Sequence, residues 1–251
     1  MAQPNPLWRG FGLYCLTMNR KVLLIVGLAA AVLAGAAGYY LLRRWGSSPI
    51  RNQYLGEWFR DPQGHLDWTI QTGDRCGDAP FLMPTNGYIG YLWGDSFRPG
   101  HSHQGIDIFG GTPPGEVEVR TAYAGYVTRL PDWRSSIIVR IPDDPLQPGR
   151  QIWTYYTHMA EADGTSLIDP AFPPGTSEVF APAGTMLGLQ GNYSGTVGSP
   201  TGVHLHFSIV LDDGHGSFRN ELLIQNTLDP SPYLGLALNA QENKGVIPTC
   251  R

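Results

Sequence analysis

The sequence predicts an all-β protein, and three observations support this fold class. Glycine (32 residues) and proline (21 residues) are frequent while charged residues make up only 15%, which favours short strands and turn-rich loops. From Phe81 onward, short β-branched and aromatic runs alternate with clusters of Gly, Pro, Asn and Asp. After residue 45 no stretch has the pattern of a long amphipathic helix.

The expected strands follow one another between residues 88 and 224. They are Tyr88–Trp93, Glu116–Thr121, Gly125–Thr128, Ser136–Ile141, Gln151–Tyr156, Thr185–Leu189, Val203–Leu211 and Leu222–Ile224. The Pro- and Gly-rich segments between them, such as Asp143–Gly149 and Asp169–Thr176, are expected to be surface loops.

Length and composition limit the class of protein. A chain of 251 residues holds one sizeable domain plus appendages. A net charge of -4 gives no basic footprint for nucleic acid, so we expect no nucleic-acid partner. The three cysteines, Cys15, Cys76 and Cys250, form no Cys-x-x-Cys motif, which argues against a thiolate zinc site.

An uncharged apolar run covers residues 22–42 and is flanked by Arg20-Lys21 and Arg43-Arg44. As a helix it would be about 31 Å long, enough to cross a bilayer. We therefore expect a transmembrane helix or signal anchor, and Lys21 and the arginines before it favour an N-terminus inside the cell. The alternative is a signal peptide that starts at Met18 and is cleaved near Ala34-Gly35-Ala36.

Residues 43–75 open like a linker and then mix aromatic and charged side chains. We expect part of this segment to pack on the main domain, because it carries Tyr54, Trp58 and Trp68. His65 is interpreted as a surface or structural histidine.

Two histidines lie one residue apart in Val203–Phe207. In an extended strand, residues i and i+2 point to the same face, so His204 and His206 would lie side by side. Such a pair also occurs by chance or on a solvated strand face, and its meaning depends on partners elsewhere.

Two upstream motifs supply those partners. In His103-Gln104-Gly105-Ile106-Asp107 an imidazole and a carboxylate are four residues apart, with a glycine that lets the backbone bend between them. Zinc accepts both ligand types, and a catalytic zinc typically has three protein ligands and one open position. His158 ends the aromatic run Tyr155-Tyr156-Thr157 and is a candidate for a catalytic role beside the ligands.

The ordered set of these motifs resembles the lysostaphin-type (LytM-like) zinc metallopeptidases, which are peptidoglycan endopeptidases. The order is His-x-Gly-x-Asp, then Tyr-x-His, then His-x-His-Phe. The similarity covers about residues 80–235, and the ordered set is more specific than any single motif. The flanking segments that agree are Phe81–Pro84 with Gly87, Trp93–Arg98, Val119–Val127 and Ala183–Gly188.

This resemblance implies a compact antiparallel β-sheet or sandwich peptidase domain of the lysostaphin-like, duplicated hybrid motif type. It implies that His103, Asp107 and His206 bind Zn2+ and that His204 and His158 are catalytic. One of these two would take a proton from water and the other would stabilise the oxyanion, and which does which stays open.

Several residues receive other interpretations. His101 is a rival first ligand, but Gly105 follows it at the spacing where Asp107 follows His103, so His101 is placed at the groove rim. His215 is read as a turn residue. The Gly- and Ser-rich segment Asn192–Gly202 is expected to form a groove wall, and Asp143–Arg150 to be an insertion.

The expected organisation has five parts. These are a cytoplasmic N-terminal segment (1–21), the transmembrane helix or signal anchor (22–42), the linker and packing segment (43–75), the zinc metallopeptidase domain (76–238) and a tail (239–251). In an oxidising exterior we expect a Cys76–Cys250 disulfide that ties the ends of the domain together.

The predicted function is a zinc metalloendopeptidase that hydrolyses peptide bonds in peptidoglycan cross-links or stem peptides. We expect a single-pass membrane protein with its catalytic domain outside the cytoplasm, or a secreted protein if the apolar run is cleaved. One alternative is a non-catalytic envelope protein that binds or activates another hydrolase. Another is a peptidase that acts on extracellular protein or glycine-rich peptides.

Overall fold

The structure is a computed structural model that describes residues 20–44, 49–96 and 101–250. The chain divides into two compact units, Met1–Arg44 and Trp45–Arg251. Several predictions fall outside the described residues: most of the segment 1–21 with Cys15 and Met18, the linker opening at 46–48, and Phe97 and Arg98 of a flanking motif.

Helix α1, Arg20–Arg44, covers the apolar run near the N-terminus. Among the residues that the structure describes, no helix is both long enough and apolar enough to pass through a membrane. The run is therefore helical, as expected, but the prediction of a transmembrane helix over 22–42 is not supported.

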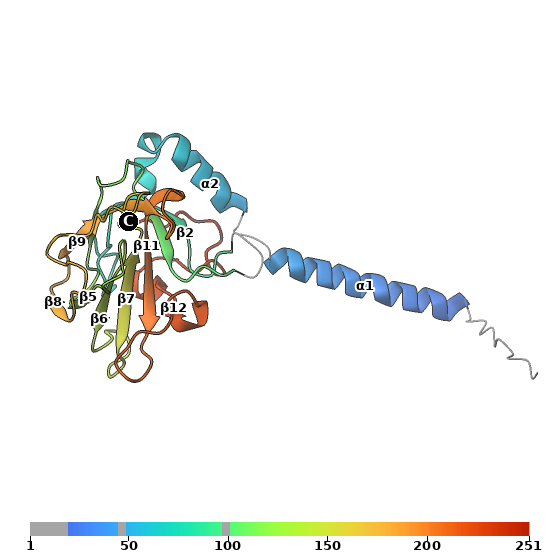
Figure 1. Ribbon diagram of the computed structural model, residues 1–251. Helices are drawn as coiled ribbons and strands as arrows, with labels where there is room; N and C mark the ends of the chain where they lie inside the picture. The colour runs from blue at the N-terminus through green and yellow to red at the C-terminus, as the bar shows by residue number, and fades with distance from the viewer. Residues whose placement is uncertain (1–19, 45–48, 97–100, 251) are drawn as a thin grey trace, which may run out of the picture. The chain divides into compact units, whose positions relative to one another are not determined.

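The second unit is built on an antiparallel sheet of ten strands, as the all-β prediction requires. Its strand order is β1-β2-β3-β11-β7-β6-β5-β8, and β10 and β12 also pair with β11. Figure 1 shows β11, β7, β6 and β5 side by side. The strands are β1 Thr69–Ile70, β2 Gly87–Tyr91, β3 Ile106–Phe109, β5 Gly125–Thr128, β6 Ile137–Ile141, β7 Ile152–Thr157, β8 Val179–Ala181, β10 Gly191–Tyr193, β11 Pro200–Leu211 and β12 Thr227–Leu228.

A second, two-stranded sheet completes the main core. It consists of β4, Glu118–Arg120, and β9, Met186–Leu189. Its Val119 and Leu187 are fully buried in the same apolar cluster as Tyr156 and Phe207 of the large sheet. The observed domain is therefore antiparallel and β-rich, with the two sheets sharing one core.

Seven of the eight expected strands overlap observed ones, and the eighth is wrong. Leu222 lies in a turn, and Ile224–Asn226 forms the 3-10 helix η2. The side chain of Asn220 accepts the backbone N–H of Leu222 at 2.9 Å. A local turn held by an asparagine thus outweighs the apolar character of this segment, and the strand β12 begins only at Thr227.

Helix α2, Pro49–Arg60, lies within the segment expected to be linker and packing surface. Arg51, Tyr54, Leu55 and Trp58 recur at the helical spacing i, i+3, i+4 and i+7. Leu55 and Trp58 are buried in a second apolar cluster with Tyr88 and Phe109 of the sheet. The expectation that this segment packs on the main domain is confirmed, although its helical form was not predicted.

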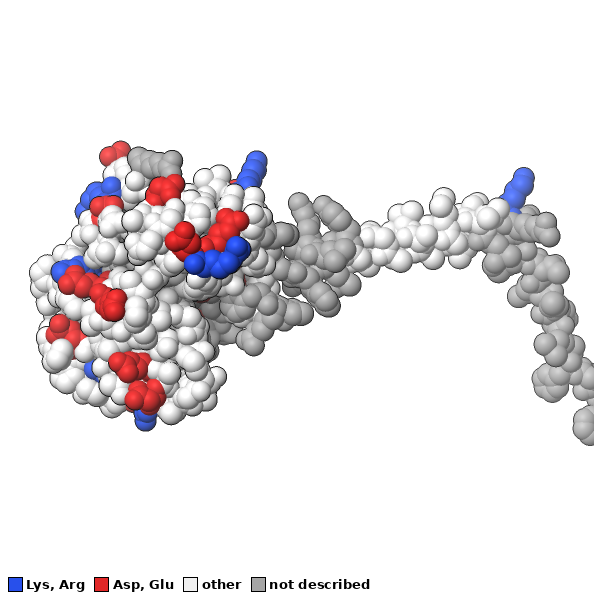
Figure 2. Space-filling view, turned by 90° about the horizontal axis from the view of Figure 1, so that it is seen from above, with Lys and Arg blue, Asp and Glu red and all other residues white. Residues whose placement is uncertain are grey.

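The remaining short elements are η1, Gln63–Trp68, and α3, Ser231–Leu234. Cys76 and Cys250 form a disulfide with their Cα atoms 5.0 Å apart, which confirms the predicted pairing. On the face drawn in Figure 2, charged side chains of both signs are scattered and intermingled.

Candidate metal centre

Strand β11 presents the His-x-His pair to one side of the sheet. The alternate residues Leu205 and Phe207 are fully buried in the main core, so the alternation of a strand turns His204 and His206 to the opposite face. The register then places His206 beside Asp107 on β3 and beside Thr157 on β7. A pairing between distant strands, rather than a local motif, assembles this site.

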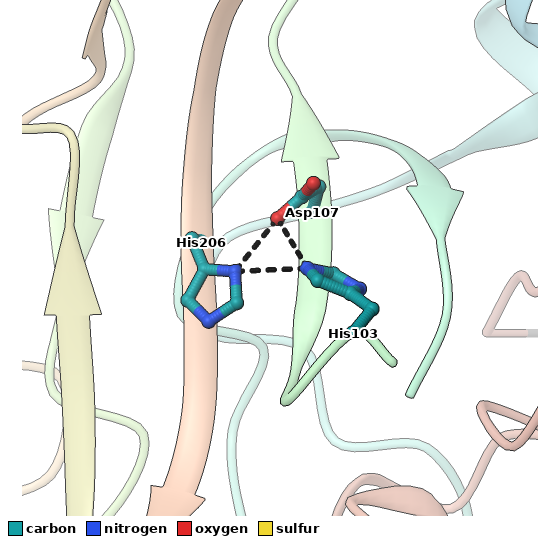
Figure 3. A group of neighbouring side chains, drawn as sticks. All are labelled: His103, Asp107 and His206. Atoms are coloured by element: carbon teal, nitrogen blue, oxygen red, sulfur yellow. Dashed lines mark hydrogen bonds and ion pairs between the residues drawn. The ribbon is translucent and has the colours of Figure 1, made fainter. Parts of the chain in front are cut away.

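Three donor atoms from His103, Asp107 and His206 converge at one point (Figure 3). Nε2 of His103 lies 3.0 Å from Oδ1 of Asp107 and 2.9 Å from Nδ1 of His206. Nδ1 of His206 is in turn 2.9 Å from the same carboxylate oxygen. The structure therefore brings together the three residues predicted as zinc ligands.

Gly105 matters because of a close backbone approach rather than a bend. A Cβ atom at this position would lie 2.1 Å from the carbonyl oxygen of Phe207. Only a glycine allows the segment that carries His103 and Asp107 to lie this close to β11. This contact is the physical reason why the glycine of the His-x-Gly-x-Asp motif is needed here.

Hydrogen bonding orients the ring of His103 toward this point. Its Nδ1 lies 3.0 Å from the carbonyl oxygen of Leu92, which can only accept, so Nδ1 carries the proton. When the ring is neutral, the lone pair of Nε2 consequently faces Asp107 and His206. This is the tautomer that a metal ligand requires.

The pKa shifts of the three triad residues favour a positive charge at the point where their side chains meet. Burial raises the pKa of Asp107, but His103 and His204 outweigh it and hold the pKa well below its usual value. Burial lowers the pKa of His103, but Asp107 and the Leu92 carbonyl outweigh burial and raise the pKa overall. For His206, burial dominates and lowers the pKa to about 4, which keeps this ring neutral near pH 7.

The donor set fits a zinc ion. Two imidazole nitrogens and a carboxylate oxygen are typical of a catalytic zinc with one open position. Tetrahedral zinc at ordinary bond lengths separates its ligand atoms by about 3.3 Å. The three observed separations of 2.9–3.0 Å are a few tenths of an ångström shorter, so a small outward adjustment of the side chains accommodates the ion.

His204 and His158 flank the triad with matching orientations. Nδ1 of His204 donates to the carbonyl of Gly202 at 2.6 Å, and Nδ1 of His158 donates to the carbonyl of Tyr193 at 2.6 Å. Their ring centroids are 4.4 Å apart. Burial lowers the pKa of His204 to about 4 and also lowers the pKa of His158. Both rings are therefore neutral near pH 7, with an unprotonated Nε2.

His158 also has an unusual backbone. Its φ of 73° lies in the left-handed region, which a residue other than glycine rarely adopts. Such conformations persist where the surrounding structure holds them, and they are common at functional sites. The conformation places the ring beside His204 and the triad at the end of β7.

The triad lies in an open groove with a cavity volume of about 710 Å³. One part of its lining is hydroxyl-rich, where Ser136 contacts Tyr155 at 3.0 Å and Thr157 at 2.7 Å. The predicted wall segment Asn192–Gly202 contributes Tyr193, Ser194, Gly195, Thr201 and Gly202 to the lining.

The other histidines lie where the sequence suggested. His101 lines the groove without joining the triad. His65 stacks on Trp68 with ring centroids 3.8 Å apart, and the backbone N–H of His215 bonds to Asp213 within a turn. None of the described groove-lining residues comes from the insertion Asp143–Arg150.

Sequence reasoning did not identify α2 as part of the groove. Leu55 and Phe59 of this helix line it, and Phe59 packs edge-on against Phe109 at a centroid distance of 5.2 Å. Phe109 in turn stacks on His204 at 5.0 Å. The helical spacing of Arg51, Tyr54, Leu55 and Trp58 was the available signal for this helix.

Comparison with known proteins gives structural likeness only. No family model and no curated protein matches the chain. A candidate M23 peptidase of Pseudomonas aeruginosa aligns at 18% identity and TM-score 0.38 over 73% of this chain, which spans 60% of that protein's length.

Two peptidase catalytic domains align similarly. That of the antimicrobial peptidase lysostaphin from Staphylococcus simulans has 22% identity and TM-score 0.36, with 59% of this chain and 89% of that one covered. That of the prophage-encoded M23 protein EnpA from Enterococcus faecalis has 20% identity and TM-score 0.35, with 59% and 95% covered. These three TM-scores are all below 0.5, so the likeness carries no argument about function.

Proposed function

We propose that this protein is a zinc-dependent endopeptidase that hydrolyses peptide bonds of peptidoglycan cross-links or stem peptides. The observation that carries the proposal is the convergence of His103, Asp107 and His206, flanked by two neutral histidines in the lining of an open groove. The ordered motifs of the sequence support the same reading.

In this proposal the triad holds zinc through Nε2 of His103, a carboxylate oxygen of Asp107 and Nδ1 of His206. When bound, zinc supplies Lewis-acid activation of a carbonyl group and of water. The chain's own contribution is to orient these donors. The Leu92 carbonyl fixes the His103 tautomer, and the β3–β11 register fixes the distance between Asp107 and His206.

In this proposal His204 and His158 accept and donate the proton that is transferred in the reaction. Each has its Nδ1–H engaged by a backbone carbonyl, so each can accept a proton only at Nε2. The ring that takes a proton from the attacking water becomes an imidazolium, which can then donate to the developing oxyanion or to the leaving amine. Because the two rings have equivalent hydrogen bonding, we assign the role of general base to the pair and not to one ring.

The groove lining supports a peptide as substrate. None of the described residues that line it is Lys or Arg, so it lacks the usual means of binding an anionic polymer. The hydroxyl groups of Ser136, Tyr155 and Thr157 can bond to a peptide backbone, and Phe59 and Leu55 can contact its apolar side chains. The disulfide supports an oxidising location outside the cytoplasm.

A non-catalytic envelope protein of the same fold is the alternative. The presence of all three ligand residues together with both flanking histidines favours an enzyme, because a binding module does not need neutral proton acceptors beside a metal. The third reading, a peptidase of extracellular protein or glycine-rich peptides, differs only in substrate.

Metal analysis combined with digestion of purified muropeptides tests the proposal. We expect the wild type to bind one zinc per chain and to release cleaved peptides, and a chelator to stop cleavage until zinc is restored. His206→Ala should be inactive. A wild type that binds no zinc and cleaves no muropeptide would contradict the proposal, whereas zinc with cleavage of other peptides only would revise the substrate.

A further inference from the structure

Helix α2 is joined to the candidate metal centre by a buried ion pair. Nη2 of Arg51 lies 2.7 Å from Oδ1 of Asp95, and the side chains are only 7% and 1% exposed. Removing two charges from water is costly unless the geometry is good and further hydrogen bonds satisfy the groups. The remaining partners of Asp95 therefore decide what this pair does.

Those partners are the backbone N–H groups of Leu92 and His103. The second carboxylate oxygen of Asp95 accepts the backbone N–H of Leu92 at 2.8 Å. The backbone carbonyl of Asp95 accepts the N–H of His103 at 2.7 Å. The carbonyl of Leu92 then accepts the Nδ1 proton of His103 at 3.0 Å.

A continuous chain of contacts thus runs from α2 to a predicted zinc ligand. Arg51 bonds to the Asp95 carboxylate, Asp95 bonds to the backbone N–H groups of Leu92 and His103, and the Leu92 carbonyl bonds to the imidazole. The carbonyl of Leu92 is one step removed from the ligand, and partners of this kind orient metal-binding rings and raise the affinity of the site. Arg51 acts on this partner through Asp95.

We propose that Arg51 is a positioning residue of the zinc site, which acts on His103 through Asp95. This inference rests on the proposed function. It makes α2 part of the metal centre, although the sequence placed this segment outside the peptidase domain. The minimal functional unit then begins no later than Pro49, the first residue of α2.

The chain offers a matched control in a second ion pair. Nη2 of Arg150 lies 2.5 Å from Oδ2 of Asp144, and the Asp144 side chain is completely buried. Neither residue lines the groove. Replacing Arg150 also leaves a buried carboxylate without its cation, but the other hydrogen-bond partners of the Asp144 carboxylate are Leu146 and Tyr233, which do not belong to the triad. The Arg150 variant therefore separates an effect on zinc affinity from a general loss of stability.

The test is zinc affinity of the full chain, measured by competition with a chelating dye, together with urea unfolding. Arg51→Met should weaken zinc binding by about 10-fold, the lower end of the range for a direct partner of a metal ligand. Arg150→Met should lower the urea midpoint while it leaves zinc affinity within about twofold of wild type. Arg51→Lys keeps the charge but cannot reach both Asp95 and the Asn243 carbonyl as the guanidinium does, and its affinity should be intermediate.

The double variant R51M/D95N guards against a failure to fold, because it leaves no unpaired carboxylate. It should fold and still bind zinc more weakly than wild type. Wild-type affinity in folded R51M or R51M/D95N would overturn the inference, as would an equal loss in R150M. A wild type that binds zinc and cleaves muropeptides keeps the proposed function intact in either case, whereas a wild type without zinc overturns both.

Discussion

At the scale of single residues, the two histidines of β11 have different surroundings although they share one strand face. Nδ1 of His206 faces Asp107 and His103, whereas Nδ1 of His204 is engaged by the Gly202 carbonyl. Nε2 of His204 is 3.7 Å from the Asp107 carboxylate, close to the triad but not one of its three converging atoms. His206 therefore lies at a ligand position, and His204 lies beside it.

This difference gives the first prediction. His206→Ala should lose bound zinc, because it removes one of three donors. His204→Ala should retain zinc and lower kcat by about 100- to 10,000-fold, the usual contribution of a positioned acid or base. Metal content and turnover are measured on the same preparations. Loss of zinc in both variants would contradict the separate roles.

The position of the His158 ring depends on the backbone conformation of His158 itself. Its φ of 73° and its bond to the Tyr193 carbonyl set the ring beside His204. The Tyr-x-His motif predicted a histidine at the end of a strand, but the left-handed backbone had no sequence signal. The stabilising partner is a carbonyl 35 residues away in the chain.

At the scale of elements, the site depends on how closely β3 and β11 approach. Leu205 is paired with Ile108, and Phe207 with Ile106, which places His206 opposite Asp107. A register slip of one residue would turn both histidines of β11 into the core. Gly105 lies next to this pairing, where a side chain would collide with the Phe207 carbonyl.

The second prediction follows from this contact. Gly105→Ala should destabilise the domain by about 1–3 kcal/mol, because overpacking forces the strands apart, and it should also weaken zinc binding. Gly56→Ala in α2 is the control. Its Cβ meets no atom within 4 Å, so stability should rise by about 0.5–1 kcal/mol. Urea unfolding and zinc titration of both variants check this, and unchanged zinc affinity in Gly105→Ala would refute it.

At the scale of the whole molecule, the disulfide joins residues that are 174 positions apart. It therefore ties Cys250, near the C-terminal end of the described chain, to the loop between β1 and β2. Cys250 and Cys76 both contact the main apolar cluster. A cross-link of this span mainly restricts the unfolded chain, since it closes a very long loop.

The third prediction concerns this link. The double variant C76S/C250S should lose roughly 2–5 kcal/mol of unfolding free energy, while its zinc site stays intact because neither cysteine belongs to the triad. Urea unfolding and zinc content measure the two effects. Thiol labelling of the unreduced wild type should find neither Cys76 nor Cys250 reactive, and two freely alkylated thiols would rule out the link.

The sequence by itself determined the fold class, most strands, the disulfide and the five histidine and aspartate residues that meet in the groove. The strands and the motifs of the site were accessible because their signals are local: alternation within strands, the His-x-His spacing, and the four-residue spacing of His103 and Asp107. The disulfide was predicted because only Cys76 and Cys250 follow the apolar run, and the roles of the site residues came from the resemblance of the ordered motifs. The strand wrongly predicted at Leu222–Ile224 shows the limit of such signals. An apolar run does not indicate that the side chain of Asn220 holds the segment in a turn.

Only the tertiary structure decided how these residues are assembled. The pairing of His206 with Asp107 joins positions 99 residues apart, and strand register between distant segments is set by packing of the whole sheet. The role of α2 was hidden for the same reason. Its bond from Arg51 to Asp95 crosses 44 residues, and no local pattern in either segment encodes the partner.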